Sequence, residues 1–442
     1  MPDNSKPLFS RPVLAIIMVF CTLAVWVLQL TAPSSKLPTP NIETSATHSG
    51  IPIIWLEQDS WEGGDKVEIR FAFRTPTPQS APTDTNLAQT TLAMLMSDSL
   101  PLSTASINQR LAPLAAQASS HYDYESQVIG VTLSSQTAYL MRTLSLVNNW
   151  LAEPAFKHRT LDSWQRRHSE TEPYKAERGL FQDRSKQENN TDAAAVTLEQ
   201  VSQYYKTMHS NASAIYVIGN LNKEAKVAIE EVLNNVSKND QLAVASTSIE
   251  DYEPTSRTVE FNKKSASDYL WQTQSAVALK PIASVKEWIS LQIWGADLVS
   301  TLNQQTNMDF VQLAFTLSPQ HPWARWNIQY SAALTQDAES LNTKMLDAKS
   351  LLTQQNMPST QDQATFNKLF DSFKTQLEIQ TQSPTWWSYM ATQVTHLDGQ
   401  LTLEDFVSSY KEAIDTFTQT DYQNALTDLL KTSTYQEIQV YQ

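Results

Sequence analysis

The chain has 442 residues, of which 32 are basic and 46 acidic, so its formal net charge is −14. This length exceeds one ordinary core and favours two or three domains. Hydrophobic residues make up 41%, including twelve Trp, fifteen Tyr and fourteen Phe, which excludes a wholly disordered chain. The acidic excess repels phosphate backbones and argues against nucleic acid as a partner. One cysteine and seven histidines leave few residues for a metal centre.

An uncharged apolar run, Pro12–Ala32, lies near the amino terminus. At about 1.5 Å per residue it can cross a hydrocarbon core of about 30 Å. Lys6 and Arg11 precede it, so the positive-inside rule predicts a cytoplasmic tail at residues 1–11. A cleaved signal peptide is the alternative, but the run is long and lacks a clear small-x-small cleavage site. We therefore predict an uncleaved single-pass anchor at residues 12–32, with a periplasmic ectodomain at the inner membrane if the source is a Gram-negative bacterium.

Residues 33–50 are rich in Pro, Ser and Thr and are predicted to be a linker. A first half is predicted over residues 51–238. It opens with a strand at 51–55, followed by an alternating strand at 66–73. The rest of this half is predicted as helices at 86–100 and 103–117, a strand at 122–134, helices at 138–151, 159–187 and 197–208, a strand at 212–219 and a helix at 221–236.

The polar stretch 239–258 is predicted to link this half to a second one at residues 259–442. The predicted elements of the second half are a strand at 269–279, a helix at 285–302, strands at 310–317 and 324–333, three or four helices, and a final strand at 435–441.

A local sequence match supports a repeat. Thr197–Lys206 and Thr402–Lys411 share five of ten residues at a constant offset of 205. Each segment has the Thr-Leu-Glu start that is typical of a helix amino terminus. Together with the matching element order, this predicts an α+β protein of two related halves.

Two further segments show a characteristic order of secondary-structure elements. Thr197–Asn220 runs through a helix, a turn and a buried strand, and Trp150–Phe156 precedes a long polar helix. In this the chain resembles the insulinase, pitrilysin and mitochondrial processing peptidase family of metallopeptidases. The resemblance covers residues 51–238 better than 259–442. It implies two α+β halves, each a mainly antiparallel sheet with helices on one face, that pack face to face.

The family's active site is an inverted zinc motif, H-x-x-E-H, on a helix. Two His at i and i+4 share a helix face and bind zinc, and the intervening Glu acts as general base. The resemblance places the two ligand positions at Gln89 and Ala93 and the base position at Leu92. All three groups are therefore missing, and neither zinc nor another cofactor is expected.

The family's third zinc ligand, a glutamate, would fall at Glu170 or its neighbour Glu172. A lone carboxylate on a polar helix is more simply a solvated surface charge, so Glu170 is a weak candidate. A rebuilt metal site could draw on His168 near Glu170. It could also draw on His121, which we expect to share one strand face with Asp123 and Glu125. A polar edge-strand face explains that second pattern as well.

Two aromatic clusters are candidates for binding. One contains Trp323, Arg325 and Trp326 on a predicted strand, and the other is the pair Trp386 and Trp387. Core or interdomain packing explains such clusters. The alternative is a peptide- or partner-binding surface, because Trp and Arg are favoured at interfaces.

These features predict a membrane-anchored, catalytically inactive pseudoenzyme with a metallopeptidase-like fold. It would act as the partner subunit of an active metallopeptidase, as a homo-oligomer, or as a scaffold that binds peptides at its edge strands. One alternative is an active zinc-dependent peptidase with a rebuilt site. The other is an envelope assembly or secretion factor that kept only the fold.

Overall fold

The computed structural model describes residues 37–58, 61, 64–75, 84–101, 103–168, 175–181, 196–243, 254–265, 268–304, 308–330, 349, 352 and 356–442. Thr39–Gln442 form one compact unit. The predicted anchor at residues 12–32 lies outside the described ranges. Within those ranges, no helix combines the length and the apolar character that a membrane crossing requires.

The first sheet has six strands in the order β1-β2-β6-β3-β5-β4. Its strands are β1 Asn41–Ala46, β2 Pro52–Glu57, β3 Lys66–Arg74, β4 Gln117–Tyr122, β5 Ser126–Ser134 and β6 Ala212–Ile218. The helices of this first half are α2 Asp84–Met96, α3 Ile107–Leu111, η2 Ala112–Leu114, α4 Thr137–Ala152, α5 His158–His168, η3 Ala176–Leu180, α6 Leu198–His209 and α7 Lys223–Val236.

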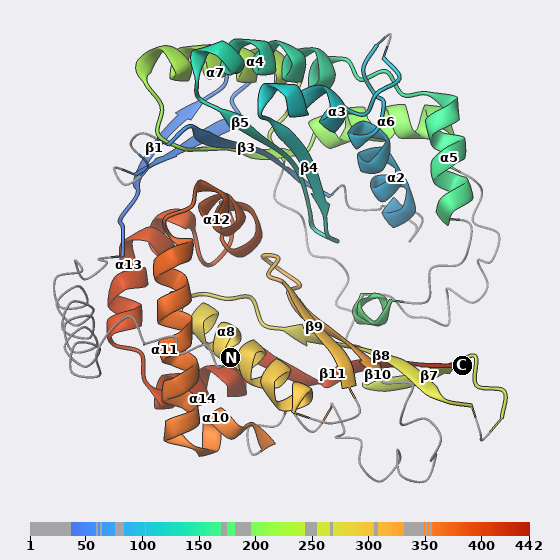
Figure 1. Ribbon diagram of the computed structural model, residues 1–442, viewed down its shortest axis with the longest axis vertical. Coiled ribbons are helices and arrows are strands. Elements are labelled where there is room, and N and C mark those ends of the chain that lie inside the picture. Colours follow the sequence, from blue (N-terminus) through green and yellow to red (C-terminus); the bar gives the residue numbers. More distant parts are fainter. Residues whose placement is uncertain are drawn as a thin grey trace, which may run out of the picture. The chain divides into compact units, whose positions relative to one another are not determined.

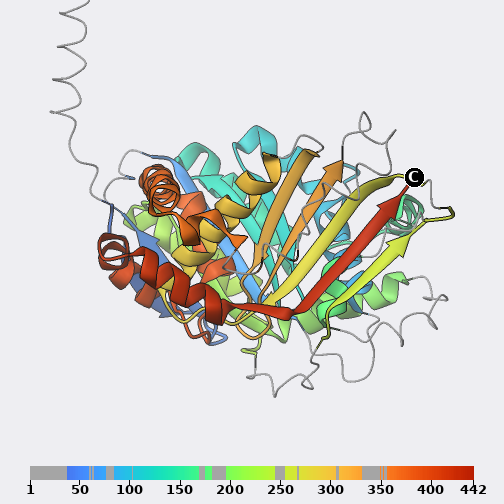
Figure 2. The same ribbon diagram turned by 90° about the horizontal axis from the view of Figure 1, so that it is seen from below.

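The second sheet has five strands in the order β7-β11-β8-β10-β9, seen side by side in Figure 2. They are β7 Arg257–Phe261, β8 Leu270–Leu279, β9 Met308–Thr316, β10 Trp323–Tyr330 and β11 Leu430–Tyr441. The helices of this second half are α8 Val285–Asn303, α10 Pro358–Gln361, α11 Gln363–Gln380, α12 Pro384–Tyr389, the π-helical turn η8 Met390–Val394, α13 Leu403–Asp415 and α14 Gln419–Leu429.

The two sheets share one topology. Each contains one parallel pair, β2·β6 or β7·β11, followed by three antiparallel strands that end in β4 or β9. Thr197 and Thr402, which open the repeated sequence, are both helix N-caps with a complete capping box, on α6 and α13. The predicted α+β class, with two sheets and their helices, is confirmed.

Each sheet buries one face under its helices (Figure 1). In the first half, α4 and α7 cover one face, and the core between them and the sheet includes Ile69, Val147 and Ile229. In the second half, the Trp326 ring of β10 makes an edge contact with Trp294 of α8, at 6.2 Å between centroids. The other faces of the two sheets, called the inner faces below, are turned toward each other.

Several predicted boundaries were wrong. The residues 33–50 predicted as a linker include β1, which pairs with β2. The predicted helix at 103–117 is only α3 and η2. Ala115, in the left-handed region at φ 50°, ends η2, and β4 follows. The final strand begins at Leu430, five residues before the predicted start.

The predicted strand 122–134 is interrupted by a turn. The Asp123 carboxylate accepts hydrogen bonds from the N–H groups of Glu125 and Ser126, at 2.7 and 2.6 Å, and so stabilises the turn between β4 and β5. The predicted long helix 159–187 is described only as α5, and the separate 3₁₀ turn η3 follows later in the chain.

Candidate functional site

The three positions at which the zinc motif is missing lie on α2, a helix that packs against the core of the first half. Leu92, at the base position, is 3% exposed and belongs to the main core of the first half. Gln89 and Ala93, at the ligand positions one helical turn apart, are half-buried. This helix therefore presents an amide and two apolar side chains where a zinc centre needs two imidazoles and a carboxylate.

Helix α5 packs against α2 through an indole. Trp164 Nε1 donates a hydrogen bond to Thr90 Oγ1 at 3.1 Å, and Leu161 packs with Met94 of α2. The side chains of His168, Glu170 and Glu172 lie outside the described residues. Among the residues whose side chains are described, no three His, Cys, Asp or Glu gather as a metal site would require.

The predicted shared strand face of His121, Asp123 and Glu125 was wrong. His121 is the penultimate residue of β4, and the other two lie in the turn that follows. His121 Nε2 lies 3.8 Å from Asp123 Oδ2, and hydrogen bonds to the Asp123 carboxylate overcome its burial and lower its pKa. Glu125 instead faces the second half, so these residues do not form a ligand set.

The turn residue Glu125 contacts the β9–β10 turn. Glu125 Oε1 lies 2.7 Å from His321 Nδ1 and accepts the His321 backbone N–H at 2.6 Å. Its Oε2 accepts the Gln320 N–H at 3.0 Å. One carboxylate thus joins the tips of two hairpins from different halves.

A second polar cluster lies on the inner face of the first sheet. Glu68 is fully buried and accepts hydrogen bonds from Arg70, from Thr132 and from Thr385 of α12, each at 2.7 Å. Arg70 Nε also donates to Ser388 Oγ at 3.2 Å. Helix α12 of the second half is therefore held against the first sheet.

The strands β1 and β4 are the two edges of the first sheet, and Asn108 of α3 caps part of β4. Asn108 Oδ1 accepts the Ala118 N–H at 2.6 Å, and Asn108 Nδ2 donates to the Ala118 carbonyl at 3.0 Å. One side chain thus pairs with a main-chain donor and acceptor as a neighbouring strand would. This blocks strand addition at that end of β4.

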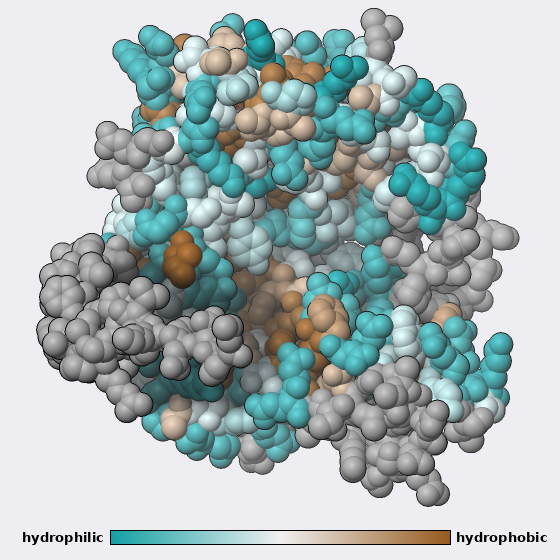
Figure 3. Space-filling view, in the orientation of Figure 1, coloured by the Kyte–Doolittle hydropathy of each residue, from teal (hydrophilic) through white to brown (hydrophobic). Residues whose placement is uncertain are grey.

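The strand β9 is the corresponding edge of the second sheet. It has nine residues, no proline and one charge, Asp309, and its Phe310 is 53% exposed. Figure 3 shows apolar side chains gathered on this face over α8 and β9. Long edges without lysine or proline are ready templates for another strand.

The aromatic candidates occupy different environments. Trp326 and Trp387 are fully buried in the core of the second half, and Trp386 is half-buried against Trp288, at 6.3 Å between ring centroids. Trp323 and Arg325 lie on the inner face, where they contact η3 of the first half. Of the five candidates, only these last two lie on a surface between the halves.

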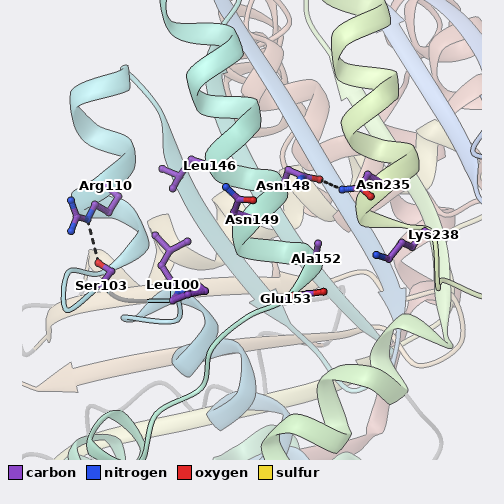
Figure 4. A pocket seen from close by; sticks show the side chains of 11 residues that line it. Leu100, Ser103, Arg110, Leu146, Asn148, Asn149, Ala152, Glu153, Asn235 and Lys238 are labelled. Carbon is purple, nitrogen blue, oxygen red and sulfur yellow. Dashed lines mark hydrogen bonds between the residues drawn. The ribbon is translucent and has the colours of Figure 1, made fainter.

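A groove lies on the outer side of the first half, among α3, α4 and α7 (Figure 4). Its volume is about 670 Å³. Arg110, bonded to Ser103, and Lys238 lie toward opposite ends of it, and Asn235 donates to Asn148 between them. Its lining holds one carboxylate, Glu153, and no histidine or cysteine, so it lacks an acid–base pair.

The sequence patterns did not predict the residues that join the halves, above all Glu68, Arg70, Glu125 and Glu177. Glu68 and Arg70 stand on the polar side of an alternating strand, a pattern that ordinarily indicates a face in water. For Glu68 and Arg70 the one available signal was their position on a strand; Glu125 lies in a turn and Glu177 in a 3₁₀ helix, where a charge is ordinary.

The fold described above, two facing α+β halves with a helix at the place of a zinc motif, is that of the M16, or insulinase-like, peptidases. No family model and no curated protein matches the sequence. Among solved structures, a protease from Helicobacter pylori aligns with a TM-score of 0.64 at 10% identity, over 91% of this chain and 99% of that one. The peptidase M16 inactive domain from Pseudomonas fluorescens aligns with a TM-score of 0.62 at 14% identity, over 90% and 97%.

A third neighbour is longer than this chain. The periplasmic protease PqqL from Escherichia coli aligns with a TM-score of 0.58 at 13% identity, over 92% of this chain but 46% of that one. At these identities the likeness shows the fold. The predicted resemblance to the insulinase-like peptidases is therefore confirmed at the level of the fold.

Proposed function

We propose that this chain is a catalytically inactive insulinase-like protein that works as a partner subunit or a peptide-binding scaffold. The observation that carries the proposal is the burial of Leu92 in the first core, where a zinc peptidase needs its general base. The half-buried Gln89 and Ala93, and the Trp164–Thr90 contact, complete a packed helix pair in place of a metal site.

The proposal includes the amino-terminal anchor. The uncharged run at residues 12–32, with Lys6 and Arg11 before it, supports a single-pass protein whose halves at 51–238 and 259–442 lie outside the cytoplasm. Peptides would bind by strand addition, for which β9 offers a longer edge than the partly capped β4.

The test measures the metal content and the peptidase activity of the purified chain and of its His168→Ala variant. We expect the wild-type chain to retain no stoichiometric zinc after dialysis and to leave a mixed peptide library uncut, while it captures extended peptides. Stoichiometric zinc with peptide cleavage, both lost on His168→Ala, would support the rebuilt-site peptidase instead. Cross-linking in intact membranes then separates a partner subunit from a free-standing assembly factor by the protein captured.

A further inference from the structure

A short segment of the first half lies on the inner face of the second sheet. Residues 175–181 come between α5 and α6, and η3 is the short green helix drawn between the two sheets in Figure 1. Ala176 and Leu180, at 0 and 5% exposed, pack against a patch of β8, β10 and β11. The patch residues are Ala276, Trp323, Ile438 and Val440.

The segment also carries a buried carboxylate, Glu177, which forms an ion pair with Arg325 of the second sheet. Glu177 is 4% exposed, and its Oε1 accepts a hydrogen bond from Arg325 Nη1 at 2.6 Å. The Arg325 guanidinium lies 5.7 Å from the Trp323 ring centroid, which supports it from one side. A buried carboxylate is tolerated only with such a partner, so this position selects an acidic residue.

Two further positions restrict what fits. A Cβ on Gly179 would lie 2.6 Å from Gln436 Oε1, and that amide is held by bonds to the carbonyls of Thr255 and Thr434, at 2.7 and 3.0 Å. Phe181 stacks on Tyr124 at 4.4 Å between ring centroids. The second sheet therefore requires a small residue at Gly179, whereas Tyr124, in the β4–β5 turn of the first half, supplies the stacking partner for the aromatic ring two residues later.

The segment binds through side chains. Its main-chain hydrogen bonds run from Arg178 N to the Lys175 carbonyl and from Phe181 N to the Arg178 carbonyl, at 3.1 and 3.3 Å, within the segment. Displacing it would leave the strand ladders of the second sheet intact. In addition, the buried Glu177 Oε2 has no hydrogen-bond partner among the described residues, so the sheet satisfies only one oxygen of the resident segment's carboxylate, which weakens its hold on that segment.

We propose that this face of the second sheet is a docking site for a peptide with the pattern acidic–x–Gly–Leu–Phe, and that Ala176–Phe181 occupies it in cis. The inference rests on the proposed scaffold function and adds a peptide class and a surface distinct from the strand edges. A tethered segment has an effective concentration on the order of millimolar. Because the cis segment fills most of the sites, the apparent affinity for a partner peptide is the intrinsic affinity multiplied by the fraction of sites left free.

The experiment measures binding of a fluorescein-labelled peptide, Tyr-Lys-Ala-Glu-Arg-Gly-Leu-Phe-Gln, to the full chain by polarisation. Leu180→Ser in the chain weakens the cis segment, so it should raise the affinity for the labelled peptide on the order of 100-fold over wild type. Glu231→Gln, an exposed change on α7, is the matched control and should leave the wild-type affinity unchanged. A peptide with Gln in place of its Glu should bind the Leu180→Ser chain at least about 10-fold more weakly, since a charge-assisted bond is lost.

A second set of measurements exchanges the charges of the Arg325–Glu pair between the chain and the peptide. Leu180→Ser/Arg325→Glu should lose the original peptide and bind one that carries Lys in place of Glu. Because the decisive changes are in the peptide, loss of folding cannot produce this pattern. Equal binding of the Glu and Gln peptides, or no binding to a Leu180→Ser chain that keeps its unfolding midpoint, would overturn the docking site. Concentration-dependent dimers that exclude the peptide would also overturn it, because a second copy would then be the occupant.

Failure of the two proposals can be told apart. A chain that captures other extended peptides but not this one keeps the scaffold function and loses the docking site. A zinc-loaded chain that cleaves peptides loses the scaffold proposal, whereas discrimination between the Glu and Gln peptides would still uphold the docking site.

Discussion

Glu125 and His321, 196 residues apart, are joined by two hydrogen bonds to one carboxylate oxygen. Glu125 Oε1 lies 2.7 Å from the His321 ring Nδ1 and 2.6 Å from its backbone N. Both residues sit at hairpin tips, Glu125 between β4 and β5 and His321 between β9 and β10. Because the carboxylate also accepts the Gln320 N–H, the two tips are held as one unit.

Replacement of Glu125 should weaken this junction. Glu125→Ala removes three acceptor contacts and should lower the free energy of unfolding by about 2–3 kcal/mol. Glu125→Gln keeps one carbonyl acceptor and should cost about 1 kcal/mol. Urea unfolding measures both. A loss for Glu125→Ala no larger than that for the exposed Glu231→Gln would show that the hairpin tips contribute nothing to stability.

Replacement of the buried Glu68 should lower the free energy of unfolding more than replacement of Glu125. Its removal in Glu68→Ala leaves the Arg70 side chain, 13% exposed, without its main counter-charge, and should cost about 3–5 kcal/mol. Thr385→Val deletes only the hydroxyl that α12 donates and should cost about 1 kcal/mol. A double-mutant cycle should show non-additive losses, since both changes remove the same bond. Additive losses would contradict the contact.

The position of Leu92 predicts a contrast between neighbouring substitutions on α2. Leu92→Glu places a carboxylate in an apolar core and should cost more than about 4 kcal/mol or prevent folding. Gln89→Glu, at a half-buried position three residues earlier, should cost less than about 1 kcal/mol. Chemical unfolding followed by Trp fluorescence gives both values. Equal tolerance would mean that α2 has room for an active-site base.

Acid should weaken the packing around His396. Burial lowers its pKa, against the opposing hydrogen bond to the Leu317 carbonyl at 2.7 Å and the charges of Asp123 and Glu125. As pH falls below about 6.5, the unfolded chain binds the proton first, so the free energy of unfolding decreases until the folded pKa is passed. His396→Gln should flatten the stability profile between pH 7 and 5. A mutant profile parallel to that of the wild type would refute this.

Asn108 should protect the β4 edge. Asn108→Ala removes both bonds to Ala118 and should cost about 1–2 kcal/mol, because it leaves an edge donor and acceptor without their partner. It should also increase binding of extended peptides and the tendency to associate through that edge. Light scattering and peptide titration measure these effects, and Asn148→Ala on α4 is a control of the same chemistry.

Much of the first half could be predicted from local patterns. The alternation over Lys66–Phe73 predicted β3, and the run at 138–151 predicted α4 to within one residue at each end. These elements bury one side of a regular period, which the chain records locally. The strands β1 and β4 were missed because short, polar edge strands such as Asn41–Ala46 bury little and carry no apolar alternation.

By itself, the sequence determined the two α+β halves and the lack of His and Glu at Gln89, Leu92 and Ala93, because element type and residue chemistry are local properties. Only the tertiary structure decided that polar strand faces are covered: α12 covers Glu68, and η3 covers Arg325. Alternation separates the two faces of a strand, but it cannot show whether water or a segment more than a hundred residues away lies against the polar one. The junction between the halves, and the docking face proposed for it, arise from such distant contacts.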